Sequence, residues 1–253
     1  MSDLRAVVLG VRQLIRLGEN GPHLKSVVSS LSAPITRWSK WESRVSPDGT
    51  LLSPDVSFVE PMLRRRLSSL ARMTLRVAYD CAWDIPGVRF VYASRHGELT
   101  RTTTMLESIA DKETLSPALF SMSVLNASAG LFSMLQGNVA PSTAVSAGDS
   151  SFSYGLMEAC MQLADNPERP VLFIYADEPA PAVYGVNELS GCEAHAVGCL
   201  LESSAAMRIN CVSTREESDS SEEVQSRAFL RCLDQGQASW HGSGLTWSWT
   251  KSA

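Results

Sequence analysis

The sequence predicts a mixed α/β fold, and three observations carry that prediction. Apolar residues recur at spacings of three and four over residues 59–82, which is the period of an α-helix. Two short apolar runs, residues 88–94 and 171–176, have the length and residue types of buried strands. The chain has 253 residues, of which 44% are hydrophobic and 19% charged, so its composition suits one large α/β domain or two small ones.

The N-terminal part opens with an apolar run at residues 4–11 that has the length of a strand. Glycine and proline recur through residues 18–57, and we therefore expect an irregular excursion there. The helical period of residues 59–82 follows, and Pro86 with Gly87 ends this region.

The centre of the chain continues with alternating strands and helices. The strand at residues 88–94 leads into a helix expected over residues 97–112. Residues 115–117 form a break, and a second helix through residues 125–135 stops at Gly137.

A short strand of small and β-branched residues is expected at residues 141–147. The segment from Gly148 to Ser151 then turns the chain into a helix that carries apolar residues as far as Leu163. Pro170 precedes the buried-looking strand at residues 171–176, and Asp177 and Glu178 follow at its C-terminal end.

The last part of the chain predicts two strands, at residues 194–202 and 207–212, joined as a hairpin over residues 203–206. Acidic residues and serines alternate over residues 215–223, which predicts a mobile acidic loop. Residues 224–233 fit a final amphipathic helix, and no internal repeat is present.

Charge and composition argue against several classes of protein. The formal net charge is −5 and the pI is about 5.4, so nucleic acid is not an expected partner. No apolar run approaches the roughly 20 residues that cross a bilayer, and the N-terminus lacks signal-peptide order, which places the protein in the cytoplasm. The six cysteines form no CxxC pair and are expected to be buried thiols. Cys192 and His195 lack a second pair of ligands, so no metal or cofactor is expected.

A nucleophile could lie in the turn at residues 146–151, just before the helix that carries Phe152, because a helix N-terminus offers free N–H groups. Gly148 supplies no nucleophile, which leaves Ser150 or Ser151, and His96 is the best-placed of the four histidines to act as a base. The G-x-S-x-G motif is broken by Phe152.

Other polar residues favour ordinary structural roles. Asp177 and Glu178 are neighbours on a strand and point to opposite faces, so solvated carboxylates are preferred over a catalytic pair. Arg64, Arg65 and Arg66 belong to the solvated face of a helix or form a docking patch for an acidic partner.

Four blocks of the sequence together resemble the N-terminal half of a β-ketoacyl synthase. They are Phe58-Val-Glu-Pro-Met-Leu-Arg-Arg-Arg-Leu, Ala93-Ser-Arg-His-Gly-Glu-Leu, Leu115-Ser-Pro-Ala-Leu-Phe-Ser-Met-Ser-Val-Leu-Asn, and Pro141-Ser-Thr-Ala-Val-Ser-Ala-Gly-Asp-Ser-Ser-Phe. The blocks occur in the order of the family, and the resemblance is strongest from Phe58 to Glu202.

The resemblance implies a thiolase-like half, a mixed sheet sandwiched by helices, in a single domain over residues 1–253. Gly148 stands where the family has its cysteine nucleophile, and the second half that carries two catalytic histidines is expected to be absent. Without the thiol no acyl-enzyme forms, so the chain is similar to a chain length factor, a family member without catalytic activity. It is also similar to the ketoacyl-synthase-like subunits of aryl polyene gene clusters.

This resemblance also implies partners and surfaces. A full-length β-ketoacyl synthase is the expected partner in a heterodimer, joined through the third strand and the residues after it: Ser142, Thr143, Ala144, Val145, Ser146 and Ala147. The implied walls of the acyl-chain tunnel are Met122, Asn126, Phe132 and Met134, although apolar residues at helical spacing are more often plain core. Acyl carrier protein is expected to dock at Arg64, Arg65 and Arg66. With the resemblance, this docking role is as well supported as the alternative that the three arginines belong to the solvated face of a helix.

Two alternatives remain open from the sequence. The first is a stand-alone acyl-transfer enzyme or thioesterase that uses Ser150 or Ser151 with His96. The second is a module that only binds acyl carrier protein and needs no synthase.

Overall fold

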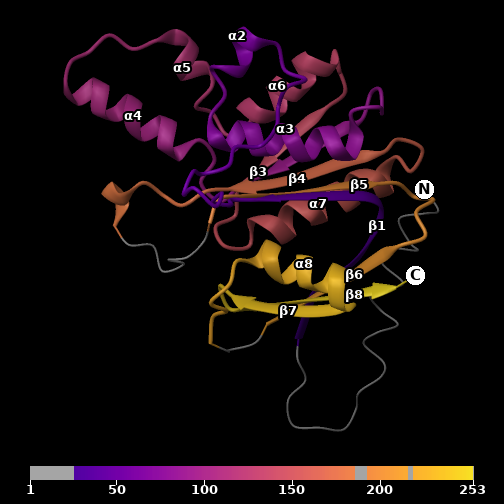
Figure 1. Cartoon of the computed structure of the whole chain (residues 1–253). Helices are drawn as coiled ribbons and strands as arrows, with labels where there is room; N and C mark the ends of the chain where they lie inside the picture. Colours follow the sequence, from indigo (N-terminus) through magenta and orange to yellow (C-terminus); the bar gives the residue numbers. More distant parts are fainter. Residues whose placement is uncertain (1–25, 186–192, 216–218, 253) are drawn as a thin grey trace, which may run out of the picture.

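The computed structural model describes residues 26–185, 193–215 and 219–252 and contains one eight-stranded mixed sheet (Figure 1). Its strand order is β3-β2-β4-β5-β1-β6-β8-β7. The strands are β1 (Ser26–Glu42), β2 (Arg89–Ala93), β3 (Ser142–Val145), β4 (Val171–Asp177), β5 (His195–Leu201), β6 (Arg208–Arg215), β7 (Gln237–Gly242) and β8 (Leu245–Ser252). The sheet is parallel between β3, β2 and β4, and antiparallel from β5 onward, which confirms the mixed α/β prediction.

Helices cover both faces of the sheet (Figure 1). The helices are α2 (Pro61–Arg64), α3 (Ser69–Ala82), α4 (Leu99–Ala110), α5 (Pro117–Ser121), α6 (Ala127–Gln136), α7 (Ser151–Asp165) and α8 (Gln225–Gln235), with a short 3₁₀ turn at Ala182–Tyr184. Helices α3 and α6 lie on one face, and α7 lies on the other, next to α8 (Figure 1). Among the residues described, no helix is long and apolar enough to cross a membrane.

Strand β4 shows how one apolar run serves two cores. Its residues alternate between the faces of the sheet, as a strand requires. Val171, Phe173 and Tyr175 pack in the core on the α7 side, whereas Leu172 and Ile174 pack in the core under α3. Burial on both faces explains why this strand reads as a continuous apolar run.

Strand β1 corrects the irregular excursion predicted for residues 18–57. This 17-residue strand lies between β5 and β6 and changes partner in its middle: Pro34 is paired with Arg208 of β6, and Ile35 with Leu201 of β5. Leu31, Ala33 and Ile35 alternate toward the core, but the serines and Pro34 between them masked that period. A proline is tolerated because the hydrogen-bonding partner changes there. The strand predicted at residues 4–11 lies outside the described residues.

The C-terminal third also differs from the prediction. Strands β5 and β6 do not form the expected hairpin, because β1 lies between them. Strands β7 and β8 were not predicted, although Trp240, Trp247 and Trp249 alternate toward the core on them and are almost fully buried. Of the predicted acidic loop, residues 216–218 lie outside the described part, and the Ser221 N–H donates to the His241 carbonyl at 2.8 Å.

Two helical predictions need adjustment. The helix expected over residues 59–82 is divided into α2 and α3, because the Ser68 hydroxyl accepts from the Ala71 N–H at 2.9 Å and starts a new helix. The break at residues 115–117 opens the short helix α5, with Pro117 in its first turn.

Helix α7 is fixed at its C-terminal end and in its middle. The buried guanidinium of Arg89 donates to the Gln162 carbonyl at 2.6 Å and to the Asn166 carbonyl at 2.8 Å, where helix carbonyls lack partners. A Cβ at Gly155 would lie 2.6 Å from the Ala93 Cβ and 2.7 Å from the Phe173 ring, so glycine is required for this close approach. The N-terminal end of α7, and the turn before it, are thereby held over β2 and β4.

Candidate functional site

Strand β3 forms one edge of the sheet and is the place of the expected interface. Within the described part of the chain it pairs only with β2, in parallel, and its side chains are partly or fully exposed from Ser142 to Val145. The Pro141 and Val145 carbonyls accept from the N–H groups of Phe90 and Ser94. By the alternation of a parallel ladder, the N–H and C=O groups of Ser142 and Ala144 point away from β2. Strand β3 therefore offers an open row of hydrogen-bonding groups.

The turn between β3 and α7 carries Gly148 where a nucleophile would lie. Ser146, Ala147, Gly148 and Asp149 are all exposed. Gly148 has φ +56°, in the left-handed region, and a Cβ placed there would meet nothing within 4 Å. The position has no side chain, so the turn itself supplies no nucleophile at Gly148.

Arg95 ties this turn to the end of β4. Its side chain is 7% exposed, with Nη1 at 3.2 Å from the Asp149 Oδ1 and Nε at 3.3 Å from the Asp177 Oδ2. The Ser146 hydroxyl donates to the Arg95 carbonyl at 3.0 Å. Arg95 therefore holds the turn at two points, through its side chain at Asp149 and through its backbone carbonyl at Ser146.

Asp177 and Glu178 correct the prediction of solvated carboxylates. Asp177 is 1% exposed and accepts from the hydroxyls of Ser94 at 3.4 Å and Tyr175 at 3.3 Å. Glu178 is partly buried and accepts from the Thr100 hydroxyl at 2.9 Å. Neither Asp177 nor Glu178 is poised as an acid–base pair, because each is engaged by different side chains.

The serine alternative finds no assembled dyad. The Ser151 hydroxyl donates to the Gly148 carbonyl at 2.6 Å and accepts from the Ala147 N–H at 2.8 Å, so it caps the turn. Within the described ranges, the Ser150 Oγ and the His96 Nε2 are buried without a hydrogen-bond partner. Burial and the positive charge of Arg95 lower the pKa of His96. The structure does not join His96 to either serine by a hydrogen bond.

A buried serine–histidine pair does exist elsewhere, between β5 and α8. The His195 Nδ1 lies 2.9 Å from the Glu193 carbonyl and must donate to it, so Nε2 accepts from the Ser226 hydroxyl at 2.6 Å. His195 is 1% exposed and Ser226 0%. Because both side chains are buried and substrate cannot reach them, the pair is structural. Sequence reasoning missed Ser226, which lies on a helix far along the chain.

The four expected tunnel residues do not share one surface. Phe132 is in the core, with its ring 5.0 Å from that of Phe90 and 6.3 Å from that of Trp83. Met122 is partly buried beside the same core, and Asn126 and Met134 are exposed. Met122, Asn126 and Met134 therefore have surface that a partner could contact, whereas Phe132 does not.

Arg64, Arg65 and Arg66 lie on α2 and the turn that follows it. Arg65 and Arg66 are exposed and form no ion pair with any described residue. The positive charge of Arg64 contributes to lowering the pKa of Asp55, although hydrogen bonds from Ser57 are the larger cause. Two arginines are therefore unneutralised on this surface.

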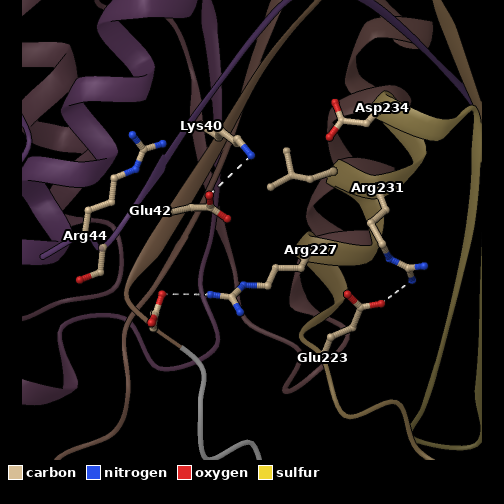
Figure 2. A pocket seen from close by; sticks show the side chains of 10 residues that line it. Lys40, Glu42, Arg44, Glu223, Arg227, Arg231 and Asp234 are labelled. Atoms are coloured by element: carbon tan, nitrogen blue, oxygen red, sulfur yellow. Dashed lines mark hydrogen bonds and ion pairs between the residues drawn. The ribbon is translucent and has the colours of Figure 1, made fainter.

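A groove of about 420 Å³ lies between the end of β1 and α8. Figure 2 shows the side chains that line it. Its charges largely pair with one another: Lys40 with Glu42 at 3.5 Å, Arg227 with Glu193 at 3.5 Å, and Arg231 with Glu223. Surface pairs of this kind contribute little to stability. The groove has no excess of one charge, and nothing in its lining identifies a ligand.

Four of the five described cysteines are buried thiols, as predicted, and Cys160 is partly exposed. Cys81, Cys199, Cys211 and Cys232 are buried, and burial raises the pKa of Cys81 and of Cys160 to about 12. Cys192 lies outside the described residues. In the part of the chain that the structure covers, no group of three or more possible ligands could hold a metal ion.

Known protein families and solved structures include relatives of this chain. The family model "Beta-ketoacyl synthase, N-terminal domain" matches residues 38–250. No curated protein sequence matches the chain.

Two solved structures extend the comparison. One is the ketosynthase (ApeO) in complex with its chain length factor (ApeC) from Xenorhabdus doucetiae, in which the matched chain is 27% identical, with a TM-score of 0.75, over 87% of this chain and 99% of that one. Another is the ishigamide ketosynthase/chain length factor, 15% identical with a TM-score of 0.56, over 81% of this chain and 73% of that one.

These matches confirm the thiolase-like fold that the sequence blocks implied. The family model spans most of the sheet and its helices, including β3, the Gly148 turn and α7. The chain belongs to the family of β-ketoacyl synthase N-terminal domains.

Proposed function

We propose that this chain is a non-catalytic subunit that forms a heterodimer with an active β-ketoacyl synthase and helps to shape the tunnel for a growing acyl or polyene chain. The observation that carries the proposal is the combination of a side-chain-free position at Gly148 with an open β3 edge beside it. A synthase needs a nucleophile at that turn, whereas a partner subunit needs an edge to pair with.

Exposed apolar side chains next to the β3 edge support the heterodimer. Met134 on α6 and Val139 between α6 and β3 are 63% and 99% exposed, and Met161 on α7 is 63% exposed. The Gln162 side chain donates to the Thr143 hydroxyl at 3.0 Å and holds α7 against β3. Large exposed apolar groups around an open strand are typical of a protein interface.

The relative from Xenorhabdus doucetiae supports the kind of partner. That relative is a ketosynthase in complex with its chain length factor, and this chain covers 99% of the matched chain. This likeness supports our proposal that the chain acts in aryl polyene biosynthesis, with a full-length β-ketoacyl synthase as its partner.

The test is co-expression with that synthase, followed by size-exclusion chromatography with light scattering. Ala144→Pro removes an N–H that points away from β2, so it should abolish the heterodimer and leave the β2 pairing intact. Ala144→Ser keeps the N–H at the same position and is the matched control. A wild-type chain that stays monomeric in the presence of the synthase would refute the proposal.

Tunnel shaping is tested in the same complex. Met134→Trp adds bulk at an exposed position of α6 and should shorten the polyene product, as read by mass spectrometry of the released chain. Phe132→Leu changes the core of this chain and should leave product length unaltered. Identical product lengths in the Met134→Trp and wild-type complexes would remove the tunnel from the proposal.

We further propose that acyl carrier protein docks on Arg64, Arg65 and Arg66. The exposed guanidinium groups of Arg65 and Arg66 have no neutralising partner among the described residues and suit an acidic surface. The double variant Arg65→Glu/Arg66→Glu should weaken carrier binding at least about tenfold. It should not make the affinity for carrier more dependent on salt concentration. Arg169→Glu, an exposed arginine before β4, is the control; equal affinity in all three proteins would exclude this surface.

A further inference from the structure

A cavity of about 220 Å³ lies between the start of α3 and the chain that follows β1. The Leu52 N–H donates to the Arg44 carbonyl at 2.8 Å and closes a hairpin that forms one side of the cavity. The first turns of α3 form another side, with Ser69 and Arg72. The described residues that line the cavity include none from β3, so it is separate from the proposed interface.

Arg72 brings a cation without a counter-charge to this cavity. Its Nη2 donates to the Arg64 carbonyl at 2.7 Å, and it forms no ion pair with any described residue. Its Nε and Nη1 have no acceptor in the described part of the chain, and neither atom is fully buried, so solvent reaches both. Arg76, one turn further along the same helix, is paired with Asp80. Arg72 is therefore free to take an anionic ligand.

The cavity also has an apolar wall, made by Trp41, Leu51, Leu52 and Pro54. Leu51 and Leu52 are 65% and 47% exposed, and Trp41 is partly exposed at the edge of the core under α3. Exposed apolar side chains gathered at one place are typical of a binding site. A cavity of about 150 Å³ is enough for benzene. The cavity beside α3 therefore has room for an apolar body of about six carbon atoms.

We propose that this cavity binds a small apolar monocarboxylate. Its carboxylate accepts from the free N–H groups of Arg72, and its carbon body packs on the apolar wall. Inorganic phosphate would leave that wall in water, and a neutral hydrocarbon would leave the guanidinium without an acceptor. Hydroxyl groups that can donate further hydrogen bonds line the same cavity, on Ser43, Ser53 and Ser69.

The experiment is a titration of the full chain with benzoate at constant ionic strength, monitored by saturation-transfer NMR. We expect saturable binding with a Kd of about 1 mM or lower. Benzamide, which has the same shape without the charge, should bind at least about tenfold more weakly. Arg72→Gln should raise the Kd for benzoate at least about tenfold, because it removes the cation. Arg169→Gln, at an exposed arginine before β4, should leave the Kd unchanged.

A second pair of variants separates the charge of the site from its folding. Leu52→Asp places a carboxylate near Arg72 at an exposed position, where it competes with the ligand for the guanidinium. Leu52→Asn has the same shape without the charge and is the matched control. The Kd for benzoate should be about tenfold higher in Leu52→Asp than in Leu52→Asn. Circular dichroism of each variant checks that the fold is kept.

The contrary outcomes are distinct. Absence of saturation by benzoate up to about 10 mM, or an equal Kd in Arg72→Gln and wild type, would overturn the inference. Benzamide that binds as tightly as benzoate would overturn the role of the carboxylate, and inorganic phosphate that binds as tightly would overturn the role of the apolar wall. The inference does not depend on the proposed heterodimer, because the titration is done without the synthase.

Discussion

Two polar networks begin at neighbouring positions of the sheet but serve different purposes. Asp177 and His195 are paired across β4 and β5. From Asp177, Arg95 leads outward to Asp149, which is 46% exposed on the Gly148 turn. From His195, the hydrogen bonds lead inward to Ser226, which is fully buried in the first turn of α8. The comparison shows that buried polar and charged side chains serve two purposes here. Through Arg95 they fix an exposed turn, and through His195 they join α8 to the sheet.

Removal of Arg95 should give the largest loss of stability. Arg95→Met leaves the Asp177 carboxylate buried without its cation, which costs about 3 kcal/mol or more in the free energy of unfolding. Urea denaturation followed by circular dichroism measures the loss. A change below about 1 kcal/mol would show that the hydroxyls of Ser94 and Tyr175 suffice for Asp177.

The inward network should respond to pH with a defined sign. Burial lowers the pKa of His195, so the folded state holds it neutral while the unfolded state protonates near pH 6.5. The contribution is fully present above pH 6.5 and is lost as the pH falls toward the folded pKa, by up to about 1.4 kcal/mol per pH unit.

Unfolding curves between pH 7.5 and 5 measure this slope, which His195→Gln should flatten. His96 also has a lowered pKa, so His96→Gln is the matched control that must leave the His195 contribution in place. A slope unchanged in His195→Gln contradicts the assignment. Ser226→Ala, which leaves the His195 Nε2 without a donor, should cost about 1–3 kcal/mol at pH 7.5.

The outward network can be tested at Gly148. Gly148→Cys restores a thiol but forces a side chain into the left-handed region, so we expect a loss of about 1–2 kcal/mol. We also expect no turnover of malonyl-carrier substrate by this variant alone, because a thiol without a polarising group does not decarboxylate it. Any turnover above that of wild type would refute a scaffold role.

Asp149 should show the smallest effect. Asp149→Asn removes the exposed half of the Arg95 network, and an exposed ion pair contributes at most about 1 kcal/mol. Its consequence should appear instead as weaker association with the synthase, measured by light scattering at decreasing concentration. Equal dissociation of variant and wild type would mean that the turn is held without Asp149.

The contrast between β4 and β1 shows what could be predicted from the sequence. Strand β4 is buried on both faces and reads as an uninterrupted apolar run, whereas β1 contains serines and Pro34 because it changes partner midway. Helix α7 was predicted because its apolar positions recur at the helical period. Local pattern therefore identified β4 and α7, whose surroundings do not change along their length, and missed β1, whose partner strand changes midway.

The site divides in the same way. The absence of a nucleophile at Gly148 is a property of one residue and was visible in the sequence. Burial of Asp177 was not, because it depends on Arg95, which is distant in the chain and meets it only when β2 and β4 pair. Spacing alone does not show which distant cation will neutralise a carboxylate.

Strand β1 has a consequence for synthesis of the protein. Glu42 pairs with His195 and Ser26 with Arg215, so β1 leaves the ribosome long before either neighbouring strand exists. At ordinary translation rates this interval is on the order of 10 s. During it, a 17-residue strand has both edges free, which favours capture by a chaperone or aggregation. Yield should therefore depend on translation speed more than on the equilibrium stability of the finished fold.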